Sequence, residues 1–344
     1  MYKNYHMKIV FILNPISGTV KKAKIPQLIE SYLDQDRYTY SIIYTEYAGH
    51  ATELASSASQ NGADVVVAVG GDGTINEVGR GLIGTQTAMG ILPCGSGNGL
   101  ARHLRIPVNL KKAIRLINQY EVRDLDYGLI NNNPFFCTCG MGFDAYISKK
   151  FADGGKRGKM TYVKYVLKEG LRYKAEDYVI EDANGQYTCH AYLVSCANAS
   201  QYGNNAYIAP HALMSDGWLD VIVMSPFDFL DAPEVSFDMM NKTLDRSKKV
   251  KTFHTKKIHI HRENPGPVHY DGDPVMMGTD IDIELVERGI KIIINPNAES
   301  NPVHPNRMQK VVCKVLNGLS GMRPKNKKNQ DIIHLQEDNS SSER

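Results

Sequence analysis

Short apolar runs alternate with amphipathic stretches through the first third of the 344-residue chain. Continuous or alternating apolar runs predict β-strands at residues 8–13, 38–45, 64–69 and 88–92. Apolar residues recur at helical spacing between them, which predicts helices at residues 25–33, 50–58, 75–82 and 109–117. Strands that alternate with helices are typical of a layered α/β domain with a largely parallel sheet.

The pattern changes after about residue 126, where longer alternating runs predict antiparallel strands at 187–197, 218–224, 257–261 and 280–286. Basic residues mark a helical stretch at 159–173, and 230–244 is a further candidate helix. We therefore predict an N-terminal α/β domain at residues 7–127 and a β-rich domain at residues 128–300.

The C-terminal segment divides into two parts. Apolar residues between 306 and 319 share one helical face, which predicts a docking helix at residues 303–322, with the first domain as one place for it to pack. Residues 325–344 are charged and serine-rich and have little to bury, so we expect them to be disordered.

Composition places the chain among globular proteins, with 42% hydrophobic and 22% charged residues. Lys and Arg total 40 against 37 for Asp and Glu, so the global charge gives no reason to expect nucleic acid as a partner. The six cysteines lack CxxC spacing, and no apolar run approaches the roughly 20 residues of a membrane span. We expect a cytoplasmic protein.

Two basic stretches, residues 156–174 and 242–262, are candidates for peripheral contact with an anionic membrane surface. A solvated helix face or loop explains them equally well.

Three glycine-rich turns each follow a predicted strand, where open α/β sheets bind ligands. The first contains Asn14, Pro15, Ser17 and Gly18, whose small side chains let backbone N–H groups approach an anion. Taken alone, this turn is weak evidence, since Asn-Pro followed by Gly is also an ordinary turn.

The second turn, Gly70, Gly71, Asp72, Gly73 and Thr74, lies directly between a strand and a helix. The glycines permit close backbone approach, and the helix N-terminus favours a phosphate group. Asp72 places a carboxylate where a magnesium ion or an attacking hydroxyl would lie. An Asp here is alternatively a helix N-cap.

The third turn contains Gly95, Ser96, Gly97 and Asn98, again between a strand and a helix. Its small residues leave backbone amides open to a ligand. A flexible surface loop is the alternative interpretation.

The ordered motifs NPISG, GGDGT and LPCGSGNGLA resemble those of the diacylglycerol kinase and sphingosine kinase superfamily, to which NAD kinases are more distantly related. The resemblance extends over roughly residues 7–300. It implies two domains with the active site in a cleft between them, the second domain being a β-sandwich. It also implies ATP as the phosphate donor and Mg²⁺ as its metal ion.

Further short matches extend the resemblance. Thr45 and His50 match a turn that contacts the nucleotide in sphingosine kinases, and Asn76 and Glu77 follow the second turn as they do in NAD kinases. The segment Asp271-Gly272-Asp273 resembles an Asp-Gly-Glu motif whose acidic residue lies at the catalytic site, although a hairpin turn would have the same sequence.

These matches yield the predicted site. Asp72 and Asp273 are the expected catalytic residues, although Asp273 is one methylene shorter than the usual Glu. Asp216 and Asp220 match an Asp-Gly-x-Leu-Asp segment associated with a metal site, for which a turn before a strand is the alternative. We assign contacts with substrate or phosphate to Asp144, Arg157, Lys159 and Asp271.

The resemblance implies an ATP-dependent lipid kinase that phosphorylates a hydroxyl of a diacylglycerol or a sphingoid base. An NAD kinase-like enzyme and a nucleotide-binding regulatory protein without turnover are the alternatives. The expected partners are a lipid substrate and a membrane surface, and a homodimer is an open alternative to a monomer.

Overall fold

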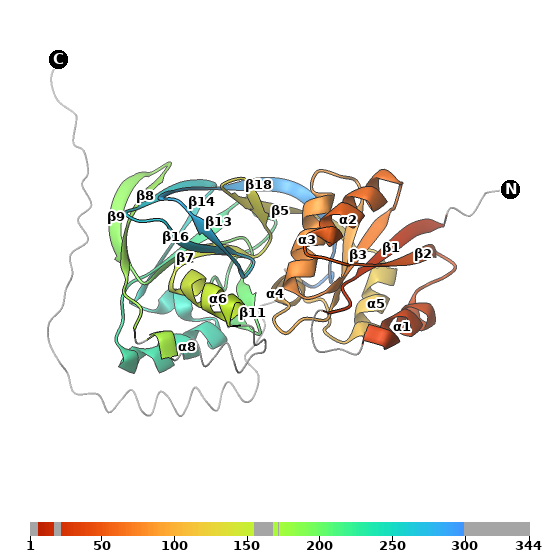
Figure 1. Cartoon of the computed structure of the whole chain (residues 1–344), viewed down its shortest axis with the longest axis horizontal. Helices are drawn as coiled ribbons and strands as arrows, with labels where there is room; N and C mark the ends of the chain where they lie inside the picture. Colours follow the sequence, from red (N-terminus) through yellow and green to blue (C-terminus); the bar gives the residue numbers. More distant parts are fainter. Residues whose placement is uncertain (1–5, 17–21, 155–167, 171, 299–344) are drawn as a thin grey trace, which may run out of the picture.

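The computed structural model describes residues 6–16, 22–154, 168–170 and 172–298, which form two parts joined by long strands (Figure 1). Several predictions concern residues outside these ranges: the docking helix, the C-terminal tail, most of the basic helix at 159–173, and the site residues Ser17, Gly18, Arg157 and Lys159.

The N-terminal part is a parallel sheet with strand order β2-β1-β3-β4. Its strands are β1 (Met7–Leu13), β2 (Tyr38–Tyr44), β3 (Val65–Gly70) and β4 (Ala88–Pro93). Every residue of β3 and β4 is buried, as expected for central strands covered on both faces.

Helices cover both faces of this sheet (Figure 1). They are α1 (Ile25–Tyr32), α2 (His50–Gln60), α3 (Asp72–Leu82) and α5 (Leu110–Gln119), with the short α4 (Gly99–His103) after the third glycine-rich turn. Helix α1 packs beside α5, and α2 packs beside α3. The predicted α/β domain with a largely parallel sheet is confirmed, and α4 was not predicted.

The C-terminal part is antiparallel. One of its sheets has the order β14-β13-β10-β7-β16-β17, and the other contains β18, β15, β8 and β9. Apolar side chains from both sheets form one core, including Val194 and Val221 from the first and Ile260 and Ile281 from the second. The predicted β-sandwich is therefore confirmed.

The strands of this part and its connections are β5 (Val122–Ile130), β6 (Asn133–Phe135), β7 (Thr138–Gly142), β8 (Glu176–Asp182), β9 (Gly185–Ala191), β10 (Leu193–Ala197), β11 (Gln201–Gly203), β12 (Ala206–Tyr207), β13 (Leu219–Met224), β14 (Val250–Thr255), β15 (Lys257–Arg262), β16 (Gly266–Tyr270), β17 (Asp273–Met277) and β18 (Asp280–Ile293). Its helices are α6 (Phe143–Asp153) and α8 (Ala232–Asn241). Helix α8 lies inside the predicted range 230–244, whereas α6 was not predicted.

Strand β18 belongs to both parts. Its first half pairs with β15, and near its end Ile292 pairs with Met89 of β4 in the parallel sheet. A bulge between Val286 and Ile290 separates the halves, with Arg288 in the left-handed region at φ 51°. The predicted strand 280–286 is therefore too short, because the local pattern is interrupted at the bulge while the pairing continues.

The predicted single strand at 187–197 is wrong. The chain forms β9 and β10 with a break at Tyr192, because β9 pairs with β8 in one sheet and β10 pairs with β7 and β13 in the other. Among the described residues, no helix combines the length and the apolar character needed to cross a membrane.

Candidate active site

Asp72 joins the second and third glycine-rich turns. It is the first residue of α3, directly after β3 and Gly71. Its Oδ2 accepts a hydrogen bond from the Asn98 backbone N–H at 2.8 Å, and its Oδ1 accepts one from the Gly99 N–H at 2.6 Å. Within the described structure, no side-chain hydrogen bond caps α3, so the N-cap interpretation of Asp72 is not supported.

Glycine is required where these two turns meet. A Cβ added to Gly95 would lie 2.6 Å from the Cα of Gly71, and a Cβ added to Gly97 would lie 2.8 Å from Asp72 Oδ2. Asn98, at φ 52°, closes the third turn through hydrogen bonds with both backbone groups of Gly95. The third turn therefore has a defined conformation, and Ser96 is exposed at its tip.

The first turn meets the second through Asn14. Its Nδ2 donates a hydrogen bond to Thr74 Oγ1 at 3.2 Å, and its Oδ1 accepts one from the Ile16 N–H at 3.1 Å. Pro15 is exposed next to it. Gly70 allows Thr74 to take this position, because a Cβ on Gly70 would lie 2.4 Å from Thr74 Oγ1.

The Thr45 segment follows β2 at the same edge of the sheet. The Thr45 N–H donates to the carbonyl of Leu13, and His50 Nδ1 accepts a hydrogen bond from the Glu46 N–H at 3.1 Å. Glu77 reaches this segment from α3, because its Oε2 accepts a hydrogen bond from the Ala51 N–H at 3.1 Å. All four predicted nucleotide-binding segments thus lie at the carboxyl ends of β1 to β4.

The segment at Asp271 is a hairpin turn between β16 and β17, with Asp271 at φ 49° and Gly272 at φ 90°. The Asp271 carboxylate accepts four hydrogen bonds, from Asn76 Nδ2 at 2.7 Å and from the backbone N–H groups of Phe136, Cys137 and Thr138. Burial raises the pKa of Asp271 and these hydrogen bonds lower it. Asp271 therefore ties the hairpin to α3.

The hairpin brings Asp273 beside the second turn. A Cβ added to Gly73 would lie 3.9 Å from Asp273 Oδ2, and the Asp273 side chain is exposed to solvent. Local desolvation raises the pKa of both Asp72 and Asp273, and the charge of Asp271 raises both further. The two predicted catalytic residues thus both adjoin Gly73, Asp72 along the chain and Asp273 in space, and each has a raised pKa.

The two predicted metal ligands, Asp216 and Asp220, each contact a different partner. Asp216 Oδ1 accepts a hydrogen bond from the Trp218 N–H at 3.0 Å, and Asp220 Oδ1 lies 3.2 Å from His254 Nε2. Asp216 lies in the turn before β13, as the alternative interpretation has it, and Asp220 is the second residue of that strand. Over the ranges that the structure covers, no cluster of three or more His, Cys, Asp or Glu side chains could hold a metal ion.

Asp144 lies in a buried polar cluster that the sequence did not predict. Its Oδ2 accepts a hydrogen bond from the Tyr202 hydroxyl at 2.8 Å and lies 2.9 Å from His269 Nε2. The Ser195 hydroxyl is 3.4 Å from that of Tyr202. Four separate elements supply these side chains, so no spacing along the sequence could have revealed the cluster.

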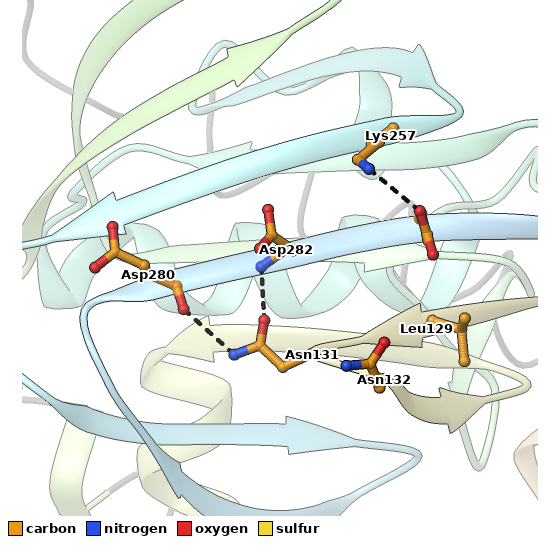
Figure 2. Close-up of a pocket in the computed structure, with 7 residues that line it drawn as sticks. Leu129, Asn131, Asn132, Lys257, Asp280 and Asp282 are labelled. Atoms are coloured by element: carbon orange, nitrogen blue, oxygen red, sulfur yellow. Dashed lines mark hydrogen bonds and ion pairs between the residues drawn. The ribbon is translucent and has the colours of Figure 1, made fainter.

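A groove of about 430 Å³ lies elsewhere, on the sheet of the second part (Figure 2). Figure 2 shows Asn131 between Asp280 and Asp282, bonded to the backbone of each. Lys257 pairs with Glu284 at 3.4 Å in the same groove. The groove shares no lining residue with the glycine-rich turns, so we do not assign the chemistry to it.

Comparison with known proteins agrees with this geometry. Residues 8–130 match the diacylglycerol kinase catalytic domain, and residues 137–293 match the YegS C-terminal NAD kinase beta sandwich-like domain. A relative from Chromohalobacter salexigens, named "Probable lipid kinase YegS-like", is 26% identical over 74% of this chain and 84% of its own length. A relative of the same name from Pectobacterium atrosepticum is 28% identical over 63% and 77%.

A solved structure from Bacillus anthracis, described as a diacylglycerol kinase, has the same fold, with a TM-score of 0.67 and 22% identity. The similarity covers 85% of this chain and 98% of that one. The two domain matches adjoin and together span most of the described residues, so the chain pairs a diacylglycerol kinase catalytic domain with a YegS-type C-terminal domain, the composition of a phosphotransferase that uses an alcohol group as acceptor.

Proposed function

We propose that this protein transfers the γ-phosphate of ATP to a hydroxyl group of a lipid, of the diacylglycerol or sphingoid-base type. The observation that carries the proposal is the position of Asp72, which backbone amides of the third glycine-rich turn hold beside the second turn. The names of the two relatives, both probable lipid kinases, support a lipid as the acceptor.

Phosphoryl transfer needs aligned reactants and stabilisation of charge on the transferred group more than covalent help from the protein. The glycine-rich turns and the N-terminus of α3 offer backbone N–H groups for the phosphates. Ser96 and Thr74 add hydroxyl groups, and we assign the Thr45 segment, which lies beside the end of β1, to contact with the rest of the nucleotide.

The two catalytic carboxylates have different roles in this proposal. Asp72 orients the acceptor hydroxyl and accepts its proton, and its raised pKa makes it a better base than an ordinary carboxylate. Asp273 is exposed, which suits a Mg²⁺ ligand, because Mg²⁺ is usually bound through one or two carboxylates together with substrate phosphates. A bound Mg²⁺ ion would neutralise charge on those phosphates.

Other predicted residues support the site indirectly. Asn76 and Asp271 bond to each other, so we assign them to positioning the hairpin and not to contact with phosphate. Asp144 remains our candidate for contact with the acceptor. It is a buried carboxylate that accepts a hydrogen bond from Tyr202, and the Tyr202 backbone packs on the third turn.

Contact with an anionic membrane surface is also part of the proposal, since a lipid acceptor lies in one. In the described basic stretch, Lys249 pairs with Asp231, Lys256 with Glu287, and Lys257 with Glu284. These pairs weaken the attraction that the stretch alone would exert. Co-sedimentation with neutral and with anionic vesicles tests the membrane contact, and we expect more protein to sediment with the anionic vesicles. Equal binding to both would contradict an electrostatic contact.

The acceptor is tested by supplying γ-labelled ATP and Mg²⁺ with diacylglycerol, sphingosine or NAD in parallel. We expect label in the organic phase with one of the lipids. Label on NAD alone would favour an NAD kinase-like enzyme. Binding of ATP without any transfer would favour a regulatory protein.

A further inference from the structure

Tyr202 lies between the nucleotide side of the proposed site and the buried Asp144 cluster. Its backbone packs on the third turn: a Cβ added to Gly99 would lie 3.2 Å from the Tyr202 carbonyl oxygen. The next residues continue the contact, because the Asn204 N–H donates to the carbonyl of Gly97 at 3.1 Å. The Tyr202 side chain points the other way and donates its hydroxyl hydrogen bond to Asp144.

Glycines allow this close packing. Gly203 has φ 115°, and a Cβ placed there would lie 3.0 Å from the Gly97 backbone. Gly97 in turn lies against the Asp72 carboxylate. The backbone at Tyr202 and Gly203 therefore packs directly on the backbone of the third turn, with no flexible side chain between them. A displacement of the turn would move Tyr202 as well.

The Asp144–His269 pair at the centre of the cluster is buried. Asp144 is 7% exposed and His269 is 2% exposed, and the Tyr202 ring lies edge-on to the His269 ring with 5.8 Å between centroids. His269 Nδ1 is buried and has no hydrogen-bond partner among the residues described. Leaving a buried polar atom unpaired is unfavourable, which is a reason to look for a functional role.

We propose that Tyr202 is a positioning residue that couples the nucleotide-binding third turn to the Asp144–His269 pair. Binding of ATP at residues 95–99 then orders the acceptor side of the site through the Tyr202 hydroxyl. The inference rests on the proposed function for the identity of the nucleotide. Coupling of two binding sites is reciprocal, so a lipid held near Asp144 strengthens ATP binding by the same factor.

Hydrogen–deuterium exchange with a non-hydrolysable ATP analogue and Mg²⁺ tests the coupling. In the wild-type protein we expect slower exchange at residues 95–99 and also at 143–147. In Tyr202→Phe, which keeps the ring and removes the hydroxyl, we expect protection to remain at 95–99 and to be lost at 143–147. Tyr178→Phe is the matched control, because its hydroxyl bonds to Glu176 in β8, away from the turn.

Kinetics give a second readout. In Tyr202→Phe the KM for ATP, measured at a lipid concentration far below the lipid KM, should stay within about twofold of wild type. The kcat/KM for the lipid acceptor should fall by roughly fivefold or more, the lower end of typical coupling. Tyr178→Phe should change neither value. A change that merely loosened the fold would raise both KM values together.

The outcomes separate the coupling from the proposed function. If Tyr202→Phe kept full protection from exchange at residues 143–147, the coupling would be overturned. It would also be overturned if the nucleotide protected only residues 95–99 in the wild-type protein. In both cases ATP binding at the third turn would stand. A wild-type protein without protection at 95–99 would instead overturn the ATP assignment, and the coupling with it.

Discussion

At the scale of single residues, the site depends on carboxylates that are desolvated and that repel one another electrostatically. Local desolvation raises the pKa of Asp72, Asp271 and Asp273, and the charge of Asp271 raises the pKa of the other two further. The glycine spacing around Asp72 made it a candidate from sequence. The bond between Asn76 and Asp271 joins residues 195 positions apart, so no local pattern could have indicated it.

Asp273 gives the first prediction at this scale. Asp273→Ala should lower kcat/KM for transfer by about 10²-fold or more, because the Mg²⁺ ion that Asp273 would hold stabilises transition-state charge by several kcal/mol. Asp273→Glu should stay active, because the side chain is exposed and has room for one more methylene. Initial rates at saturating ATP measure both. An Asp273→Ala protein with the wild-type rate would remove Asp273 from the site.

His103 gives a prediction about stability and pH. Burial, together with the charges of Lys242 and Arg105, lowers the pKa of His103 to about 4, and its Nδ1 accepts a hydrogen bond from the Ser200 N–H. The unfolded chain gains this proton near pH 6.5, well before the folded protein does. The contribution of His103 to the free energy of unfolding is therefore complete above pH 6.5 and declines as the pH falls toward 4.

His103→Asn keeps an acceptor near the Nδ1 position and removes the titration. Urea unfolding at pH 7, 6, 5 and 4 should show a smaller loss of stability for this variant, by up to about 1.4 kcal/mol for each pH unit below 6.5. Parallel curves for the variant and the wild type would show that His103 titrates normally in the folded protein.

At the scale of elements, the sequence predicted the strands and most helices of the first part, because each strand there is a short apolar run followed by a helical repeat. It failed where pairing decides the length of a strand. The run 187–197 changes sheets at Tyr192, and β18 continues past its bulge into the parallel sheet. Local periodicity contains no information about which sheet a strand joins.

The third turn gives the prediction at this scale. Gly95→Ala should weaken ATP binding by about tenfold or more, because the new Cβ would lie 2.6 Å from the Gly71 Cα and the two turns must move apart. Gly278→Ala is the matched control, since its Cβ would meet no atom within 4 Å. Equilibrium binding of a fluorescent ATP analogue measures both. Equal affinities would show that the contact between the turns is not needed for binding.

At the scale of the whole molecule, the two parts share the ten-stranded sheet, and Figure 1 shows β5 and β18 crossing between them. Asp126, 1% exposed, lies at this junction. Its carboxylate accepts hydrogen bonds from the Gly217 N–H at 3.0 Å and the Arg288 N–H at 2.7 Å. The hydrophobic pattern of the sequence changes near residue 126, which indicated a domain boundary. It could not show that a single strand, β18, pairs with strands of both parts.

A shared strand predicts cooperative unfolding. Far-ultraviolet circular dichroism and the fluorescence of Trp218 should report one urea transition. Asp126→Ala should shift that transition for both probes, with a cost of roughly 1–3 kcal/mol for each amide left without its partner. A shift in the fluorescence transition alone would show that the two parts unfold independently.

The central claim is that Asp72 serves phosphoryl transfer to a lipid hydroxyl. Its most direct test is label transfer from γ-labelled ATP to the lipid found in the acceptor panel, with wild type, Asp72→Asn and the exposed control Asp282→Asn. We predict that wild type and Asp282→Asn transfer at similar rates. Asp72→Asn should fold normally and lose about 10²-fold or more of the rate. A folded Asp72→Asn protein that transfers label at the wild-type rate would contradict the mechanism.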